Sequence, residues 1–462
     1  MKAVGARLPR YDGLAHITGR TAFVDDWPTP PGMLWAKALR SPHHSALIKS
    51  IDTSAAERLP GVHAVVTAAD MPVNIVGHLE ALGVPKDEPY LAEHEVRYKG
   101  QPIAGVAADS EQIALEALEL IKVDYEVREP FLDIRKAFDP DAPQITPEGN
   151  VFFYDPYDHR KVTKGDVDAA FAKADVIVQG AYRPAAIEQA PTETQAALVV
   201  PEPDGRLTVY TCTQAMYFTM GVLSTHLQLP QNRIKLVGGT VGGGFGGKVD
   251  SATEPLCAVL TLKTNRPVKW RFTREEEFLY ASVRASWHVE VADALTSDGW
   301  ILGRKVLTLH DAGAYTRFSS YGATKHSFHL AGAYTVPALR TRAYVVWSNH
   351  VPTTAMRGFG VTSASFAIEM QMTRGAHVLG MDPWEYRLKN ANRPGDLMPT
   401  RKVLEDPSTI DTIQACATAV GHPLSATYAE MKNEARSGEW LPEHLSNQEE
   451  DAKLGNPQGA TR

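Results

Sequence analysis

A run of eleven residues, Gly238 to Lys248, contains seven glycines and is the stretch of this sequence best suited to binding chemistry. Residues 234–237 before it predict a buried strand. Residues 251–263 after it predict a helix capped by Thr253 or Ser251. A strand, a glycine loop and a helix N-terminus present backbone N–H groups to an anion, because the missing Cβ atoms let a ligand approach the backbone. The pattern predicts an anion site, and a close-packing turn is the alternative.

The glycine run matches two common motifs only formally. Gly242, Gly244 and Gly247 fit the dinucleotide fingerprint, but residues 264–270, where that motif needs an acidic residue, contain none. The same run followed by a lysine fits a phosphate loop, but Val249 then replaces the Ser or Thr that would bind Mg²⁺. The sequence therefore favours an anionic cofactor that is neither an ordinary dinucleotide nor a nucleoside triphosphate.

The composition is that of a globular protein, with 462 residues, 44% hydrophobic and 22% charged, and a net charge of −7. This length predicts two to four domains. The acidic balance argues against nucleic-acid binding, and the sequence has no run of about eighteen apolar residues that would predict a membrane span. Cys212, Cys257 and Cys416 are too far apart for a disulfide framework, zinc or an iron–sulfur cluster. Each is expected as a small buried side chain in a cytoplasmic protein.

The hydrophobic pattern predicts an α+β fold in four parts. These are a first unit at residues 1–130, a linker at 131–160, a larger unit at 161–396, and a partly extended or disordered tail at 397–462. Helices are expected at 111–121, 216–227, 251–263, 362–379 and 409–420. Strands are expected at 33–39, 61–67, 123–127, 176–179, 197–200, 207–210, 234–237, 268–272, 287–292 and 343–347.

The longest predicted helix begins at Thr362 and ends before Gly380, which is a typical C-terminal signal. Side chains three or four residues apart form one stripe along it: Phe366, Met370, Thr373 and His377. We expect this stripe to pack in the core.

Several segments occur in the order known from one protein family. In the first unit they are Tyr11-Asp12-Gly13, Thr18-Gly19-Arg20, Arg40-Ser41-Pro42-His43, Pro60-Gly61-Val62-His63 and Tyr98-Lys99-Gly100-Gln101-Pro102. In the second they are Thr192-Glu193, Thr213-Gln214, the glycine run, Arg357-Gly358-Phe359-Gly360 and Leu379-Gly380-Met381-Asp382-Pro383. Together they resemble the molybdopterin-binding large subunit of the xanthine dehydrogenase and aldehyde oxidase family. The resemblance implies an α/β hammerhead domain followed by the first molybdopterin-binding domain. It ends about half-way along a full family subunit, as in the split large subunit of nicotinate dehydrogenase.

The resemblance implies a molybdenum–molybdopterin cofactor, in the cytosine dinucleotide form. By position, Gln214 matches a glutamine beside the oxo ligand of the metal, Phe245 lies where the loop backbone lines the metal, and Arg357 matches an arginine whose loop closes the site. These three form the expected molybdenum environment. The expected cofactor-binding residues are Gln214, Gly243, Gly244, Phe245, Gly246, Arg357 and Gly358. The metal would be held mainly by the pterin, which agrees with the absence of a metal-ligand cluster in the sequence.

Four residues are expected at the substrate: Val249, Tyr315, Lys325 and Phe359. Val249 stands where the purine enzymes have a glutamate, and Lys325 where they have an arginine. Without the carboxylate, purine N–H groups would be left unpaired at a cost on the order of 1–3 kcal/mol. The cation suits an aromatic or N-heteroaromatic carboxylate, with Phe359 stacked on the ring and Tyr315 adding a hydrogen bond. An aldehyde is the alternative substrate, and a solvated surface lysine is the alternative for Lys325.

The implied reaction is hydroxylation of an electron-poor carbon with water as the oxygen source. The glutamate base of the family has no counterpart in these residues, so no catalytic residue is expected in this chain. The base is expected on a second molybdopterin-domain subunit, and a 2Fe-2S subunit and an FAD subunit would carry the electrons away. The alternative is a non-catalytic subunit that binds pterin or phosphate for assembly, or an inactive truncated relative.

Overall fold

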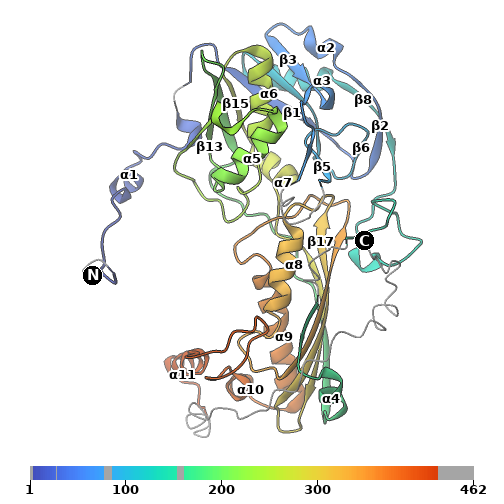
Figure 1. Ribbon diagram of the computed structural model, residues 1–462, viewed down its shortest axis with the longest axis vertical. Coiled ribbons are helices and arrows are strands. Elements are labelled where there is room, and N and C mark those ends of the chain that lie inside the picture. Colours follow the sequence, from blue (N-terminus) through green and yellow to red (C-terminus); the bar gives the residue numbers. More distant parts are fainter. Residues whose placement is uncertain (1–3, 28, 78–85, 153–160, 425–462) are drawn as a thin grey trace.

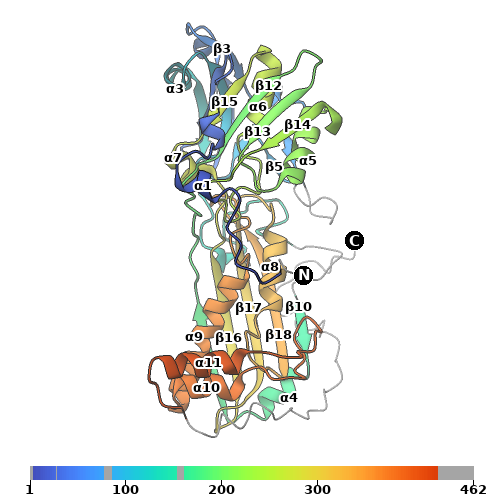
Figure 2. The same ribbon diagram turned by 90° about the vertical axis from the view of Figure 1, so that its left-hand side faces the viewer.

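The computed structural model describes residues 4–27, 29–77, 86–152 and 161–424. It shows two lobes stacked along the long axis of the molecule (Figure 1). The N-terminal segment, with the short helix α1 (Gly13–Ile17), projects from the upper lobe (Figures 1 and 2).

The upper lobe is built on a seven-stranded mixed sheet whose strands come from distant parts of the chain. Inside this sheet, β1 (Leu34–Arg40) is antiparallel to β7 (Pro102–Ala108) on one side and parallel to β15 (Val268–Arg271) on the other. The remaining strands are β3 (Val62–Val66) beyond β7, and β12 (Ala196–Pro201), β13 (Leu207–Thr211) and β14 (Ile234–Gly238) beyond β15. The sheet therefore crosses the expected boundary between the first unit and the larger unit.

The helix α6 (Glu254–Thr264) is the buried centre of the upper lobe, because its side chains from Glu254 to Thr261 are all buried. It packs so closely on β7 that a Cβ at Gly105 would lie 2.5 Å from Cδ1 of Leu256. Three other helices belong to this lobe: α3 (Glu111–Leu120), α5 (Met216–Leu227) and α7 (Arg274–Tyr280). Two smaller sheets complete it, β6 (Glu95–Val96) with β2 (Ala46–Asp52) and β8 (Lys122–Val127), and β4 (Ile75–Val76) with β5 (Glu88–Pro89).

The lower lobe is a long six-stranded sheet with α8 (Ser319–Phe328) and α9 (Val361–Leu379) along one face (Figure 2). Buried residues of α9, such as Ile368 and Met372, share a core with Val289 of the sheet. The strands are β10 (Lys161–Lys164), β18 (Ala338–Trp347), β17 (Ile301–Gly313), β16 (Trp287–Leu295) and β11 (Val176–Tyr182), with β9 (Val151–Phe152) also paired to β18. At the lower end lie α4 (Val167–Ala172), α10 (Pro383–Asn390) and α11 (Thr409–Ala419).

A turn after β17 ties the two lobes together. Arg317 donates to both carboxylate oxygens of Glu88, at 2.8 and 2.6 Å, and to Asp250 at 3.2 Å. Thr316 donates its N–H and its hydroxyl to Asp87, at 2.8 and 2.6 Å. Burial raises the pKa of the Asp87 carboxyl. Because Asp87 and Glu88 lie at β5 and Asp250 follows the glycine run, this turn fixes the lower lobe against two parts of the upper one.

The α+β class is confirmed, and every helix and strand expected from the pattern is present. The pattern missed β2, β7, β17, α7, α8 and α10. The missed helix α8 consists mostly of small and polar residues, so it carries little apolar periodicity. Among the helices of the described ranges, none combines the length and apolar composition that crossing a bilayer requires.

The expected linker and tail contain packed structure. Phe131 and Ile134 are buried in a cluster with Leu309 of the lower sheet. Residues 397–424 include α11, while residues 425–462, where an extended arm was expected, lie outside the described part of the chain. Two cysteines are buried as expected, but Cys416 is exposed on α11.

The expectation for the long helix α9 was wrong, because the stripe assigned to the core faces solvent. Phe366 and Met370 are each 47% exposed, and Thr373 and His377 are exposed as well. The buried face consists mainly of small side chains: Ser363, Ala364, Ala367, Ile368, Gln371, Met372, Gly375 and Ala376. Small residues let the helix approach the sheet closely, so close contact with β11 and β16 decided the orientation and the larger side chains did not.

Two methionines on α9 make a matched test of this orientation. Met372 is fully buried and Met370 is half-exposed. Met372→Ala should therefore destabilise the protein by about 2–5 kcal/mol, whereas Met370→Ala should change stability by less than about 0.5 kcal/mol. Urea unfolding followed by tryptophan fluorescence measures both. Equal losses in the two variants would contradict the observed orientation.

Candidate functional site

A buried ion pair holds the glycine loop between β14 and α6. The ammonium of Lys248 lies 2.6 Å from the carboxylate of Glu193, and their side chains are 0% and 9% exposed. The same carboxylate oxygen accepts the N–H of Gly242 at 2.7 Å. Gly242 has no room for a side chain, because a Cβ there would lie 2.5 Å from Cβ of Glu193. Removing one partner of a buried pair costs about 3–5 kcal/mol, so this pair fixes the path of the loop.

Two features expected to attract an anion are satisfied within the protein. Lys248 is fully buried against Glu193, so its charge is not available to a phosphate. At the start of α6, the carboxylate of the buried Glu254 accepts the Thr253 N–H at 3.1 Å and the Thr211 hydroxyl. Burial raises the pKa of Glu254. The protein's own carboxylate therefore occupies the N-terminus of α6, contrary to expectation, and the lysine and this helix end leave the loop backbone to meet a ligand.

Gln214 lies against the glycine loop. Its backbone N–H donates to Lys248 O at 3.0 Å, and its side-chain Oε1 accepts the N–H of Gly246 at 3.0 Å. Position 244 has no room for a side chain, since a Cβ at Gly244 would lie 2.4 Å from Oε1 of Gln214. No described residue accepts a hydrogen bond from Nε2 of Gln214, whose side chain is exposed. The amide N–H groups of Gln214 are therefore free to donate to a ligand.

A second loop, between β18 and α9, closes on the first. Phe245 O accepts the N–H of Arg357 at 2.7 Å. Gly246 comes so near this loop that a Cβ would lie 2.4 Å from Ala355 O. Arg284 donates to Arg357 O at 2.7 Å and so holds the second loop from its other side. The structure thus brings together Phe245, Gly246 and Arg357, which the sequence placed at one site from separate motifs.

Unusual backbone conformations gather at the two loops. Phe245 has a φ of 51° and Phe359 a φ of 41°. The flanking Gly358 and Gly360 have φ values of 97° and 91°. Residues other than glycine rarely adopt such angles, which cost on the order of 1–3 kcal/mol each. Strain of this kind is typical of a functional site.

Lys325 and Phe359, both expected at the substrate, lie together. The ammonium of Lys325 is 5.8 Å from the centroid of the Phe359 ring and 5.1 Å from that of Tyr321. The two rings are 5.5 Å apart and tilted by 52°. No carboxylate of the described residues lies within ion-pair distance of Lys325. The sequence missed Tyr321, one helical turn before Lys325, because it missed the helix α8 that brings them together.

The other two expected substrate residues lie in different surroundings. Tyr315 is 1% exposed, and its hydroxyl accepts from Nε2 of Gln101 at 2.8 Å. Burial raises the pKa of that phenol. Tyr315, expected at the substrate, therefore lies in the protein interior. Val249 is half-buried after the glycine run, and its N–H donates to Gly246 O at 3.3 Å.

Two aromatic side chains of the first unit, Phe23 and Trp27, pack against the glycine loop. A Cβ at Gly239 would lie 2.8 Å from the Trp27 ring, and a Cβ at Gly242 would lie 3.2 Å from the Phe23 ring. Asp25, between the two aromatics, is paired with Lys269 and Arg271 of β15 at 2.8 and 2.6 Å. Neither aromatic was singled out from the sequence, because packing against glycine leaves no local signal.

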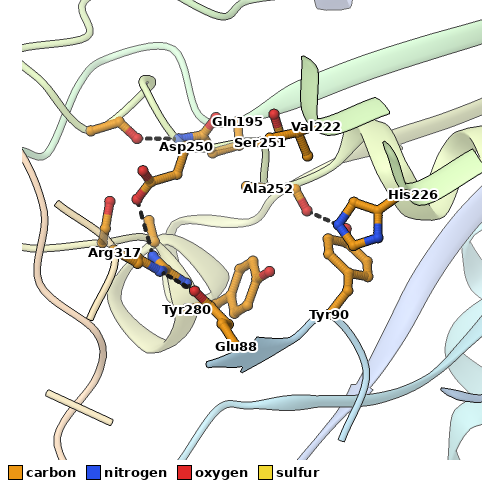
Figure 3. Close-up of a pocket in the computed structure, with 13 residues that line it drawn as sticks. Glu88, Tyr90, Gln195, Val222, His226, Asp250, Ser251, Ala252, Tyr280 and Arg317 are labelled. Carbon is orange, nitrogen blue, oxygen red and sulfur yellow. Dashed lines mark hydrogen bonds and ion pairs between the residues drawn. The ribbon is translucent and has the colours of Figure 1, made fainter. Parts of the chain in front are cut away.

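A small cavity lies behind the glycine loop, with Arg317 between Glu88 and Asp250 on one side (Figure 3). Gln195, in its wall, donates through Nε2 to Gly247 O at 2.9 Å. The N–H of Gln195 donates to the buried carboxyl of Glu277. Burial, with the nearby charge of Glu188 adding to it, raises the pKa of Glu277 to about 7. The loop is therefore supported from behind by a carboxyl that titrates near neutral pH.

Comparison with known families matches residues 147–391 to a molybdopterin cofactor-binding domain. It matches residues 18–129 to the a/b hammerhead domain of aldehyde oxidase and xanthine dehydrogenase. The chain belongs to the xanthine dehydrogenase and aldehyde oxidase family. The expected order of a hammerhead domain and a molybdopterin-binding domain is confirmed.

Three relatives show how much of the family architecture the chain contains. The large molybdopterin subunit of nicotinate dehydrogenase from Eubacterium barkeri is 34% identical over 405 residues, which cover 88% of this chain and 93% of that subunit. A probable xanthine dehydrogenase subunit of Bacillus subtilis is 36% identical over 392 residues, 84% of this chain and 51% of that protein. The structure of the Desulfovibrio gigas aldehyde oxidoreductase is similar with a TM-score of 0.84 and 31% identity, over 92% of this chain and 48% of that one. The chain spans about half the length of the last two.

The residues of the two loops fit a molybdopterin of the kind this family binds. The N–H groups of Gly243, Gly244 and Phe245 have no acceptor among the described residues, so they are available to a ligand. Gln214 adds side-chain donors beside them. The described residues include no group of three or more His, Cys, Asp or Glu that could hold a metal ion.

The raised pKa of Glu277 predicts a pH-dependent stability. A carboxyl with a higher pKa in the folded state stabilises the protein below its unfolded pKa, and this stabilisation is lost as the pH rises through the folded pKa. For Glu277 this window runs from 4.5 to about 7. The wild type should therefore lose on the order of 2 kcal/mol relative to Glu277→Gln between about pH 5 and about pH 8.

Urea unfolding of both proteins across this pH range measures the difference. Glu275→Gln, at an exposed position of the same helix, is the matched control and should follow the wild type. Parallel stability curves for the wild type and Glu277→Gln would show that the carboxyl does not titrate near neutral pH.

Proposed function

We propose that this chain is the molybdopterin-binding subunit of a multi-subunit molybdenum hydroxylase that acts on an aromatic or N-heteroaromatic carboxylate. The observation that carries the proposal is the Lys325 cation beside two aromatic rings, with no carboxylate partner among the described residues. A bound aromatic carboxylate would set its ring against Phe359 and Tyr321 and its charge at Lys325. Nicotinate, named in the description of one relative, is a heteroaromatic carboxylate, which supports the same class.

One short loop connects the substrate residues to the cofactor residues. Phe359 follows Arg357 by two positions, and the Arg357 N–H is bonded to Phe245 O. A ring held at Phe359 would therefore lie next to the loop that closes on the glycine run. This connection supports a hydroxylase over a subunit that only binds a pterin, because such a subunit has no use for a cation beside aromatic rings.

When bound, the cofactor would supply a molybdenum centre at which an electron-poor carbon is hydroxylated with oxygen from water. Gln214 would donate to it through Nε2, and Gly243, Gly244 and Phe245 would donate to it through their backbone N–H groups. Gly246 would let the two loops meet, and the loop at Arg357 and Gly358 would close over the cofactor. The proposal places the glutamate base and a second molybdopterin domain on a partner subunit, and the 2Fe-2S and FAD centres on two more. The dinucleotide form proposed is that of cytosine.

Purification of the native complex through this chain tests the proposal. Metal analysis should give about one molybdenum per chain, with iron, flavin and partner subunits. Gln214→Ala should lower turnover by about tenfold to a hundredfold while molybdenum is retained, because a donor to the reacting group is lost. A chain that purifies alone without molybdenum, or an unaffected Gln214→Ala complex, would support the assembly subunit instead.

Replacing Lys325 tests the substrate class. Lys325→Met should raise KM for an aromatic carboxylate about tenfold or more, because a charge-assisted contact is lost. It should leave KM for the matching neutral amide nearly unchanged. Steady-state kinetics with the acid, the amide and a panel of aldehydes provides both values, and Lys49→Met, on an exposed ion pair, is the control. A wild-type complex that prefers aldehydes, or treats acid and amide alike, would overturn the carboxylate assignment.

A further inference from the structure

His326, the residue after Lys325 in α8, is fully buried and has a partner at each ring nitrogen. Nδ1 lies 3.1 Å from Gly360 O and 3.1 Å from Oγ of Ser363, and Nε2 lies 3.2 Å from Oγ1 of Thr308. Because Gly360 O can only accept, the neutral ring donates to it from Nδ1 and accepts at Nε2 from the hydroxyl of Thr308. Burial lowers the pKa of His326 to about 4, which preserves this neutral form.

Aromatic stacking fixes the plane of this ring. The His326 ring stacks on Trp287, with centroids 4.3 Å apart and planes 19° apart. Trp287 stacks in turn on His310, at 4.0 Å and 25°. Such stacked contacts stabilise the orientation of the rings beyond the burial of their surface. The Nδ1 donor therefore cannot turn away from Gly360 without breaking the stack.

The acceptor, Gly360, ends the loop that carries Phe359. This loop passes so close to α8 that a Cβ at Gly360 would lie 2.4 Å from Gly322 O and 3.1 Å from the His326 N. Gly322 also faces the Phe359 ring, because a Cβ at Gly322 would lie 3.4 Å from Cε2 of that ring. The hydrogen bond from His326 to Gly360 O thus joins the loop that carries Phe359 to the helix α8 that carries Lys325.

We propose that His326 is a positioning residue whose bond to Gly360 sets the spacing between Phe359 and Lys325. This spacing would determine how strongly the protein prefers aromatic carboxylates over neutral analogues. His326 itself would not touch the substrate. The effect on preference rests on the proposed function, whereas the hold on the loop rests on the geometry alone.

Two substitutions separate the donor from the bulk of the side chain. His326→Leu removes both hydrogen bonds, whereas His326→Asn keeps a donor near the Nδ1 position. In the assembled complex, His326→Leu should lower the ratio of kcat/KM for acid over amide by about tenfold, mainly through KM for the acid. His326→Asn should recover most of this ratio. His377→Leu, at an exposed position of α9, is the control and should leave it unchanged.

Hydrogen–deuterium exchange without substrate provides a readout that does not depend on activity. Amides of residues 357–362 should exchange faster in His326→Leu than in the wild type, and at near wild-type rates in His326→Asn. If His326→Leu does not assemble, Thr308→Val, which removes only the Nε2 partner, should shift both readouts in the same direction. Wild-type exchange and wild-type preference in these variants would overturn the proposal. A wild type without preference for the acid would instead refute the proposed function, while exchange would still decide the role of His326.

Discussion

The ion pair between Lys248 and Glu193 is the interaction on which the site depends. Both charges are withdrawn from water and pair with each other, and the same oxygen of Glu193, Oε2, also accepts a loop N–H. The pair holds the glycine run in one path but leaves no charge there for a ligand. Recognition at this loop must therefore come from backbone N–H groups, from missing side chains and from the amide of Gln214. Lys325, a cation with no ion-pair partner among the described residues, lies on a different element.

The site lies where the lobes meet, so both must be in place to form it. The glycine loop belongs to the upper lobe, and the loop around Arg357 leads into α9 of the lower one. The bond from Arg357 N–H to Phe245 O crosses between them. The turn at Arg317 supports this junction from behind, through Glu88 and Asp250. A mutation in this turn would thus reach the site without changing any residue that lines it.

Much of the fold and part of the site could be predicted from the sequence. The family resemblance placed Gln214, Phe245 and Arg357 at one site, and the structure joins the glycine loop, which contains Phe245, to Gln214 and to Arg357. The interior position of Tyr315 could not be predicted, because its surroundings come from distant parts of the chain, such as Gln101, which lies 214 residues away. The predicted orientation of α9 was wrong for a similar reason, since the spacing of side chains cannot show that the face with small residues approaches the sheet more closely. Tyr321 and His326 were invisible because their helix has little apolar pattern.

The pairing of β1 with β15 has a consequence for how the chain folds. Leu34 pairs with Val268, so a strand made early in synthesis waits for one made far later. Until then β1 has only β7 beside it, and its other edge is open to the wrong partner. Contacts this distant in sequence slow folding, because a long loop must close first. We therefore expect the upper lobe to complete its sheet late, which makes the newly made chain dependent on chaperones.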